Sequence, residues 1–464
     1  MPINYLPTSK SGPMIIVIPD TGEGLDQITP PLGTLAIAGM LEREKMPFIH
    51  IDQRTEPDTE RVVLDAVRQG ALCIGVCAQT GPQISYAVRL IRAVKAEYPR
   101  FPVIWAGWHG SILPEQTLSH PDVDILIRGQ GEATVLEVLE RLRHGQSMDG
   151  CLGAAHKEDG RFVLNGERPM VDLDALPHMA YHLIDLKKYP GPSHRRRSAK
   201  DIYTTFRSSQ GCPWRCAYCA DPLVFSRRWK KLSAMRTVDE LENLVVKYGV
   251  TYVDIVDDTF IIDPARTEAI AKEIIRRKLP LKWSACARTG MIAKLSDEAW
   301  QILAEGGCDL IHPGVEVATQ SMLDSIHKDE KAENTLLAAQ KLKKAGVSGL
   351  YSFMTGFPGE APEMLDETFH VVKQLKEIDA NNIMPVNFYV PYPGNVLYDR
   401  SRTLGFEPPA RLDDWANFGT RTGKATPWLT KEFKEKVMMH DKYYLPAAFP
   451  SRFMLAKMQS DPLS

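Results

Sequence analysis

Short apolar runs and amphipathic stretches alternate along the first third of the chain. Such runs, bounded by polar, glycine or proline residues, are typical of strands buried on both faces of a parallel sheet. They cover residues 14–19, 47–52, 72–77, 103–107 and 123–128. The stretches between them space their apolar residues as helices do and cover residues 35–41, 58–69, 84–98 and 132–143. This alternation predicts an α/β fold with a doubly wound, Rossmann-like parallel sheet.

A second alternation begins at residues 202–206, a segment rich in β-forming side chains. Further strands are expected at residues 252–256, 282–286, 310–315, 348–354 and 384–389. With helices between them, these strands predict a partial (β/α)6 barrel. Ligands of such parallel barrels bind at the carboxyl ends of the strands.

The two alternations divide the chain into expected domains. These are a Rossmann-like domain over residues 1–145, a linker over 146–200, a barrel over 201–400 and a C-terminal helical cap over 401–464. Within the linker, residues 152–155 and 161–164 are expected to pair as a small hairpin, and residues 176–192 to form an extended crossover. The last region contains the sequence 412–415 and an amphipathic helix over 430–444, which we expect to cap the barrel without contributing chemistry.

Composition narrows the possible partners. The 464 residues carry a formal net charge of −2, so no broad basic field indicates nucleic-acid binding. The basic run at 194–197 is short and is interpreted as a solvated linker segment. No apolar run reaches membrane-spanning length, and the first residues lack a signal-peptide pattern. Eight cysteines in a chain of this length do not predict a disulfide framework, which fits a reducing cytoplasm.

Three of the cysteines stand in a C-x3-C-x2-C spacing, at Cys212, Cys216 and Cys219. Three thiolates on one tight loop can ligate three irons of a [4Fe–4S] cube and leave the fourth iron open to a substrate. A zinc site is the alternative. Zinc takes four ligands, usually from paired half-sites, and no second half-site follows at a suitable spacing.

The cysteine spacing resembles that of the radical SAM enzymes. This resemblance implies that the amino and carboxylate groups of S-adenosylmethionine (SAM) bind the open iron, and that an electron from the cluster cleaves SAM to a 5′-deoxyadenosyl radical. It also implies SAM contacts at the ends of the barrel strands. The expected contact residues are Tyr218, Asp257, Asp258, Arg288, Glu316, Gly356 and Pro358.

Each of these residues also has an ordinary structural interpretation. Asp258 has the chemistry of a helix N-cap, Tyr218 that of a packing aromatic, and residues 356–360 that of a tight turn. For Asp257 and Asp258, the resemblance implies contact with the SAM ammonium, to which a carboxylate is suited. Arg288 is expected to meet the SAM carboxylate, Glu316 the ribose hydroxyls, and the backbone near Gly356 the adenine.

Glycine-rich loops follow the expected strands of the first domain, at the edge where such sheets bind ligands. Glycines there allow a large planar ligand to approach the backbone. Together, ahead of the cysteine loop, they resemble the cobalamin-binding domain of B12-dependent radical SAM enzymes. The residues implied to contact cobalamin are Leu32, Gly33, Gln79, Thr80, Gly107, Trp108, His109, Gly110, Gly129, Gly131 and Glu132.

The chain departs from that family's usual loops at Ala106, where glycine is common, and at Gln130, where glutamate is common. The Asp-x-His-x-x-Gly motif of cobalamin-dependent mutases is absent, so no axial histidine is expected. A lone histidine such as His109 more often makes a structural hydrogen bond. The alternative for the whole domain is a flavodoxin-like fold without the cofactor.

Taken together, the resemblance implies a cobalamin-dependent radical SAM methyltransferase. One SAM would methylate cobalamin; a second would yield the radical that activates an unactivated carbon, which then takes the methyl group from cobalt. Ring contraction or cyclisation without methyl transfer is an alternative within the family, and a corrinoid- or SAM-binding sensor is an alternative of another class. The expected partners are a small-molecule or peptide substrate and a flavodoxin- or ferredoxin-type electron donor. The sequence names neither the substrate nor any catalytic residue beyond the cofactor ligands.

Overall fold

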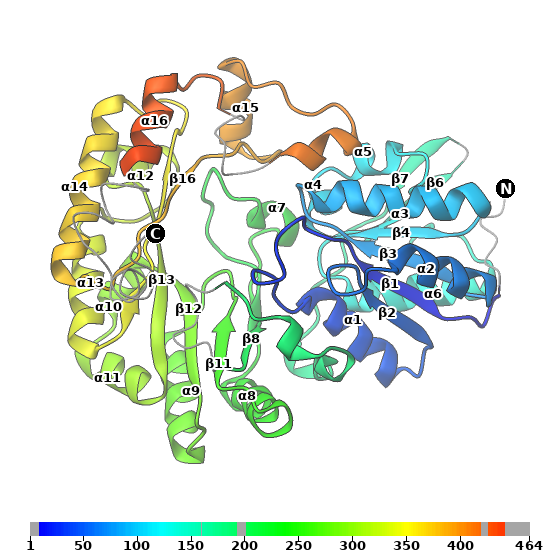
Figure 1. The fold of residues 1–464 in the computed structure, drawn as a ribbon, viewed down its shortest axis with the longest axis horizontal. Helices are drawn as coiled ribbons and strands as arrows, with labels where there is room; N and C mark the ends of the chain where they lie inside the picture. Colours follow the sequence, from blue (N-terminus) through cyan, green and yellow to red (C-terminus); the bar gives the residue numbers. More distant parts are fainter. Residues whose placement is uncertain (1–8, 159, 193–200, 419–425, 441–464) are drawn as a thin grey trace, which may run out of the picture. The chain divides into compact units, whose positions relative to one another are not determined.

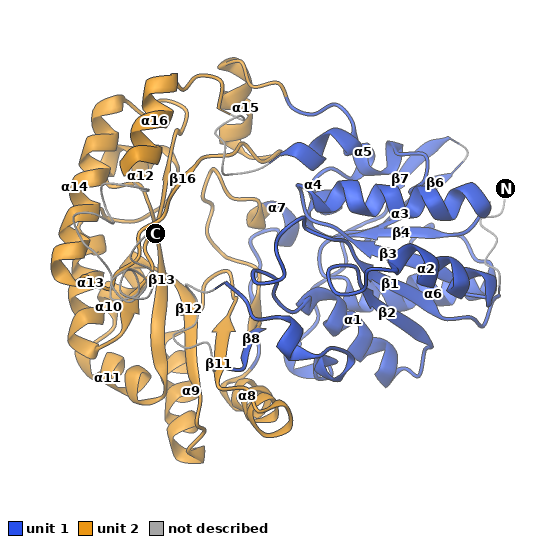
Figure 2. Cartoon of the chain, in the orientation of Figure 1, with its two compact units in different colours: residues 1–205, 223–232, 408–418 blue, residues 206–222, 233–407, 419–464 orange. Residues whose placement is uncertain are grey.

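The computed structural model describes residues 9–158, 160–192, 201–418 and 426–440. The chain divides into two compact units (Figure 2). The first comprises residues 1–205, 223–232 and 408–418, and the second comprises residues 206–222, 233–407 and 419–464. Each unit is built around its own sheet.

The sheet of the first unit has the strand order β2-β1-β3-β4-β5-β6-β7 (Figure 1). Its parallel strands are β1 (Met14–Ile18), β2 (Phe48–Asp52), β3 (Cys73–Cys77), β4 (Val103–Ala106) and β5 (Ile125–Ile127). In the central strands β1 and β4, nearly every side chain is buried. This burial on both faces explains why these strands are continuous apolar runs.

Helices connect the parallel strands of the first unit. They are α1 (Leu32–Arg43), α2 (Thr59–Arg68), α3 (Gln83–Glu97), α4 (Trp108–Ile112), α5 (Pro114–Ser119) and α6 (Glu132–His144). On one face of the sheet, Leu41 of α1 and Leu139 of α6 share a core with Ile104 and Ile125 of the strands. Gly145 ends α6 at φ 64°, a left-handed conformation that glycine adopts without steric cost.

The hairpin expected in the linker is present, and it extends the first sheet. Strand β6 (Ala154–Glu158) pairs antiparallel with β5, and β7 (Arg161–Leu164) pairs antiparallel with β6. Pairing with β6 satisfies main-chain groups that β5 would otherwise leave unpaired at the sheet edge. The segment over which an extended crossover is expected, 176–192, is irregular apart from the short 3-10 turns η2 (Tyr181–Leu183) and η3 (Leu186–Lys188), and it follows a third, η1 (Leu173–Ala175).

The predicted partial barrel is the other sheet, with the strand order β16-β15-β13-β12-β11-β8 (Figure 1). Its strands belong to the second unit, except for residues 203–205 of β8, which are part of the first. These strands are β8 (Tyr203–Phe206), β11 (Tyr252–Ile255), β12 (Lys282–Arg288), β13 (Cys308–Glu316), β15 (Ser352–Thr355) and β16 (Val386–Phe388). Strand β14 (Ser348–Gly349) also pairs with β13, and β9 (Ser209–Gln210) with β10 (Lys230–Lys231). The α/β fold class predicted from the sequence is confirmed in both sheets.

Helices alternate with the strands of the barrel, and polar side chains mark where several of them begin. The helices are α7 (Asp221–Phe225), α8 (Ala234–Tyr248), α9 (Pro264–Arg277), α10 (Thr289–Lys294), α11 (Asp297–Glu305), α12 (Gln320–Ser325), α13 (Asn334–Ala345), α14 (Pro362–Ile378), α15 (Val396–Thr403) and α16 (Lys431–Met439). Ser233, Asp263 and Ser296 each accept a hydrogen bond from a backbone N–H in the first turn of α8, α9 and α11. The N-cap of α9 is therefore Asp263, and Asp258 does not have that role.

Part of the expected C-terminal cap packs elsewhere. Residues 408–418, with the 3-10 helix η5 (Leu412–Asn417), belong to the first unit and not to the barrel. The reason lies in Trp415, whose ring is fully buried and whose Nε1 donates a hydrogen bond to Oε1 of Gln116 at 2.6 Å. The basic run at 194–197 and the part of the expected helix beyond residue 440 lie outside the described residues.

Within the described parts of the chain, no helix combines the length and apolar composition needed to cross a membrane.

Candidate active site

The loop that carries Cys212, Cys216 and Cys219 lies between β9 and α7 in the second unit. All three thiols are half-buried and free of disulfides. The backbone N–H of Ala217 donates a hydrogen bond to the carbonyl of Ile326 at 2.8 Å, which fastens the middle of the loop to the segment after α12. This hydrogen bond holds the centre of the loop in place.

Asp257, at the end of β11, anchors the start of the cysteine loop. Its carboxylate accepts hydrogen bonds from the backbone N–H groups of Ser208 and Ser209 at 2.6 and 3.0 Å and from their hydroxyls at 2.6 and 2.7 Å. All three side chains are buried. Both oxygens of Asp257 are therefore engaged within the protein, so this residue positions the loop. The sequence alone offered no sign of this role.

Asp258 lies next to the cysteines. Its Oδ2 accepts a hydrogen bond from the N–H of Gly211 at 3.1 Å. Burial raises the pKa of Asp258, and the neighbouring charge of Arg207 opposes that rise. Burial also raises the pKa of Asp221, and the adjacent carboxyl of Asp258 raises it further. Two carboxyl groups in one partly desolvated place favour a bound cation or a shared proton.

Arg288, at the end of β12, contacts the cysteine loop directly. Its Nη1 donates to Sγ of Cys216 at 3.5 Å, and its Nε donates to Glu330 at 2.9 Å. The guanidinium also donates to the carbonyl of Lys328 and lies over the ring of Trp214, 4.5 Å from its centroid. The buried guanidinium thus ties the end of β12 to the cysteine loop.

Glu316, at the end of β13, forms a buried polar group with a lysine that the sequence reasoning missed. The Nζ of Lys328 donates to Oε1 of Glu316 at 2.8 Å and to the hydroxyl of Tyr218 at 3.1 Å. Glu316 has φ 66°, a conformation that is rare for a non-glycine residue and is often found at functional sites. Burial raises the pKa of Tyr218, with a further contribution from Glu316. Lys328 lies in the stretch 326–330, which contains no motif that would indicate this contact from the sequence.

The turn after β15 lies against Tyr218. Gly356 has φ 85°, and the carboxylate of Glu360 accepts hydrogen bonds from the N–H groups of Gly356 and Phe357 at 2.5 and 3.0 Å. The ring of Phe357 meets the ring of Tyr218 edge to face at 5.7 Å. Pro358 is buried in the same turn. The structure thus brings together two regions that the sequence analysis placed near the adenine of SAM.

The thiols have properties that suit a metal cluster. Burial raises the pKa of Cys212 to about 11 and that of Cys219 to about 12. The charge of Cys216 raises the pKa of both sulfurs further, which shows that the three thiols lie near one another. Neighbouring thiols on one loop become thiolates when cations bind between them. The donor set therefore fits an iron–sulfur cluster.

The loops of the first unit meet at the carboxyl edge of its sheet. At Gly107, with φ 110°, a Cβ would lie 2.4 Å from the carbonyl oxygen of Ala78, so a side chain does not fit. At Gly129, with φ 66°, the N–H donates to Oγ of Ser111 at 3.0 Å. A recess beside this loop is lined by Ser111, Gly129, Gln130 and Phe225, among other residues. Gly107 and Gly129 carry no side chain, so a large ligand can approach the backbone next to this recess.

The remaining predicted cobalamin contacts occupy the same edge. Leu32 and Gly33 begin α1, Gly110 lies in α4, and Gly131 and Glu132 stand at the start of α6. Gly33 is exposed, and a Cβ there would meet nothing within 4 Å, so the space next to it is open. Gln79 lies in the loop after β3, where its N–H donates to Gln83 at 2.9 Å.

His109 makes a structural hydrogen bond. Its Nδ1 and the hydroxyl of Thr80 are 3.0 Å apart, and its ring packs against Trp415 at 5.4 Å. The side chain is buried, and burial lowers its pKa to about 4. A neutral imidazole beneath a tryptophan ring acts as part of the packing of this loop.

Two segments that the sequence analysis assigned to the barrel and to the C-terminal cap pack against these loops. Phe225 meets Trp108 edge to face at 6.1 Å, and Trp415 covers His109. They come from residues 223–232 and 408–418, far along the chain from the loops they contact. A Trp or Phe in a sequence signals burial but does not identify its partner.

Comparison with protein families identifies both domains. Residues 22–139 match the model of the B12 binding domain, and residues 206–372 match that of the radical SAM superfamily. The chain joins a B12 binding domain to a radical SAM domain. The two matches confirm the predicted cofactors: cobalamin for the first domain, and SAM with its [4Fe–4S] cluster for the second.

Relatives of this cobalamin-dependent radical SAM enzyme carry two kinds of name. An uncharacterized methyltransferase of Pyrococcus horikoshii is 28% identical over 393 residues, which cover 83% of this chain and 82% of the relative. An anaerobic magnesium-protoporphyrin IX monomethyl ester cyclase of Rubrivivax gelatinosus is 26% identical over 432 residues, which cover 90% of this chain and 74% of the relative.

Among solved structures, the enzyme is similar in fold to the radical SAM methyltransferase TsrM of Kitasatospora setae with cobalamin and a [4Fe–4S] cluster bound. The TM-score is 0.66 at 18% sequence identity, and the match covers 81% of this chain and 74% of TsrM.

Proposed function

We propose that this enzyme transfers a methyl group from SAM to an unactivated carbon of a small-molecule or peptide substrate. The observation that carries the proposal is the presence of both domains in one chain, together with a relative named as a methyltransferase over most of both lengths. When bound, the cluster supplies an electron for cleaving SAM, and cobalamin supplies a carrier for a methyl group.

In this proposal Cys212, Cys216 and Cys219 ligate three irons of the cluster. Asp257 holds the loop through its four hydrogen bonds, which fixes the direction of the thiols. Arg288 contacts Cys216 and places its guanidinium where the carboxylate of SAM would bind. The geometry is preorganised because Asp257 and Arg288 are buried and already hydrogen-bonded.

The other SAM contacts follow from the same arrangement. We assign the SAM ammonium to Asp258, whose carboxylate lies next to the cysteine loop through its bond with Gly211. The ribose is assigned to Glu316, which Lys328 holds in place. The adenine is assigned to the surface formed by Tyr218, Gly356 and Pro358. Asp257, whose oxygens are already engaged, contributes through the loop.

For cobalamin, we propose the glycine-rich carboxyl edge of the first sheet. The assigned residues are Leu32, Gly33, Gln79, Thr80, Gly107, Trp108, Gly110, Gly129, Gly131 and Glu132. His109 supports this edge through its hydrogen bond with the hydroxyl of Thr80. The open space beside Gly33 and the recess at Gly129 support the assignment. An external electron donor of the flavodoxin or ferredoxin type and a cytoplasmic location complete the proposal.

Rearrangement or cyclisation without methyl transfer is the second candidate. The magnesium-protoporphyrin cyclase relative, which matches 90% of this chain, favours it. The two candidates differ in the mass of the product, because methylation adds one carbon and rearrangement adds none.

Methyl-labelled SAM tests the proposed function. With the reduced holoenzyme and its substrate, we expect the label in the product, and equal amounts of 5′-deoxyadenosine and S-adenosylhomocysteine for each product formed. Mass spectrometry of candidate substrates, chosen from genomic neighbours, provides the measurement. An unlabelled product formed with normal 5′-deoxyadenosine would replace methyl transfer by rearrangement.

Cobalamin binding without a protein axial ligand is a second expected result. Because His109 is buried, bonded to Thr80 through Nδ1 and packed against Trp415, we expect it not to coordinate cobalt, although its Nε2 has no hydrogen-bond partner among the described residues. The full chain is expected to bind hydroxocobalamin. In electron paramagnetic resonance of the reduced, cob(II)alamin form, uniform 15N labelling of the protein is expected to leave the cobalt spectrum unchanged. A labelling-dependent nitrogen splitting would identify a protein ligand and contradict this prediction.

A further inference from the structure

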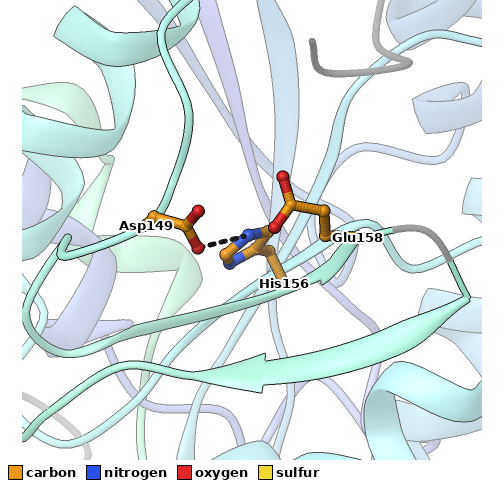
Figure 3. Close-up of side chains that lie close together, drawn as sticks. All are labelled: Asp149, His156 and Glu158. Carbon is orange, nitrogen blue, oxygen red and sulfur yellow. Dashed lines mark ion pairs between the residues drawn. The ribbon is translucent and has the colours of Figure 1, made fainter. Parts of the chain in front are cut away.

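A cluster of potential metal ligands lies outside the proposed cofactor sites. It consists of Asp149, in the loop after α6, and of His156 and Glu158 on β6 (Figure 3). One ligand atom from each residue lies within 4.8 Å of the other two. The closest pair is Nε2 of His156 and Oδ1 of Asp149, at 3.5 Å. Figure 3 shows both carboxylates turned toward the imidazole.

His156 has an unusual environment for a polar side chain. Only 3% of it is exposed, and within the described residues neither ring nitrogen has a hydrogen-bond partner. A neutral imidazole has one donor and one acceptor nitrogen, and burying either without a partner costs about 1–3 kcal/mol. A cation held with the two carboxylates would satisfy one of these nitrogens.

The sheet and the preceding loop place the three ligands on one side. His156 and Glu158 are two positions apart on a strand, so they share a face. Lys157, on the opposite face, donates to the carbonyl of His120 at 2.6 Å. This alternation keeps the lysine charge away from the ligands.

The backbone around Asp149 is held independently of any cation. The side chain of Asn165 accepts from the N–H of Gly150 at 2.8 Å and donates to the carbonyl of Met148 at 2.9 Å. Nη1 of Arg141 donates to the carbonyl of Asp149 at 2.9 Å. Hydrogen bonds to the residues on both sides of Asp149 therefore hold it beside His156.

The charges and chemistry of the cluster match a divalent ion. Two carboxylates balance a dication, and a neutral imidazole nitrogen can ligate it. Imidazole nitrogen and carboxylate oxygen are ordinary ligands of zinc, and three protein ligands leave a fourth position for water.

We propose that Asp149, His156 and Glu158 bind a zinc ion, which ties the loop after α6 to the β6–β7 hairpin at the edge of the first sheet. The site does not depend on the proposed methyl transfer. Its ion would join two adjacent chain segments and keep one position open to water.

The test uses the full chain carrying C212A, C216A and C219A, so that the cysteine loop does not take up zinc. After treatment with a chelator, zinc is titrated in competition with a chromogenic chelator. We expect one tight site per chain, and a Tm that rises on zinc addition by several degrees, as mass action predicts for an ion that binds only the folded state.

In the same background, D149N and E158Q keep the shape of each side chain and remove its charge. Each is expected to weaken zinc at least ~10-fold, since even substitutions that act through a ligand often cost that much. H156F fills the buried space with an apolar ring and is expected to remove both zinc binding and the zinc-dependent rise in Tm. If H156F does not fold, D149N and E158Q still decide the question.

The matched control is the exposed pair of His144 and Glu140 on α6, whose Nδ1 and Oε2 are 3.6 Å apart. E140Q and H144A are expected to leave zinc affinity unchanged. Absence of a tight site in the parent, or equal affinity in D149N, E158Q and the controls, would overturn the proposal.

Discussion

Replacing Cys212, Cys216 and Cys219 by alanine is expected to reduce bound iron from about four per chain to none and to abolish 5′-deoxyadenosine formation. The physical reason is the loss of all three thiolates from one loop, which leaves the cluster without protein ligands. The measurements are iron content after anaerobic reconstitution, visible absorption, and 5′-deoxyadenosine after reduction in the presence of SAM.

The matched control for these variants is Cys286→Ala on β12, a half-buried cysteine of the same unit that forms no disulfide. It is expected to keep both iron and SAM cleavage. Cobalamin binding of the triple variant is also expected to remain, because no cysteine of the loop belongs to the proposed cobalamin edge. A wild-type chain that holds zinc and no iron, or a triple variant that still cleaves SAM, would contradict the assignment.

Asp257→Ala is expected to destabilise the second unit and to release the cluster. It removes the acceptor of four hydrogen bonds from Ser208 and Ser209. Each buried donor left without a partner costs about 1–3 kcal/mol. Because water can reach some of these groups after the change, we expect a loss of roughly 3–5 kcal/mol, which is large for a single substitution.

The result is measured as the Tm of the reconstituted chain and as its iron content. Asp257→Asn keeps the size and one acceptor oxygen, so we expect an intermediate loss. Glu305→Ala, an exposed position at the end of α11, is the control and is expected to shift stability by less than about 0.5 kcal/mol. An Asp257→Ala chain with wild-type stability and iron would show that the four bonds do not hold the loop.

Periodicity was sufficient to predict the elements of both sheets. The buried strand β1 is apolar throughout, and α2 alternates buried residues such as Val63 and Val67 with charged ones, so each leaves a clear pattern. The cysteine spacing was equally informative, because ligands of one cluster must lie on one short loop. These signals are local, and a single sequence contains them in full.

Contacts between distant residues could not be read in the same way. Trp415 is 299 positions from Gln116, its hydrogen-bond partner. Likewise, Asp257 was interpreted as a SAM contact, whereas its bonding partner Ser208 lies 49 positions earlier. A carboxylate at a strand end has the same chemistry whether it faces a ligand or a loop. Only the fold determines which of them it meets.

The division of the first unit among three chain segments has a consequence for the order of synthesis. A domain made of one segment can fold once that segment has been made. Here the layer that covers His109 is supplied by residues 408–418, long after residue 205. At roughly 5–20 residues per second, a delay on the order of tens of seconds separates the two. During that time the nascent first unit carries an uncovered surface around His109, which makes this edge the expected place for chaperone contact on the ribosome.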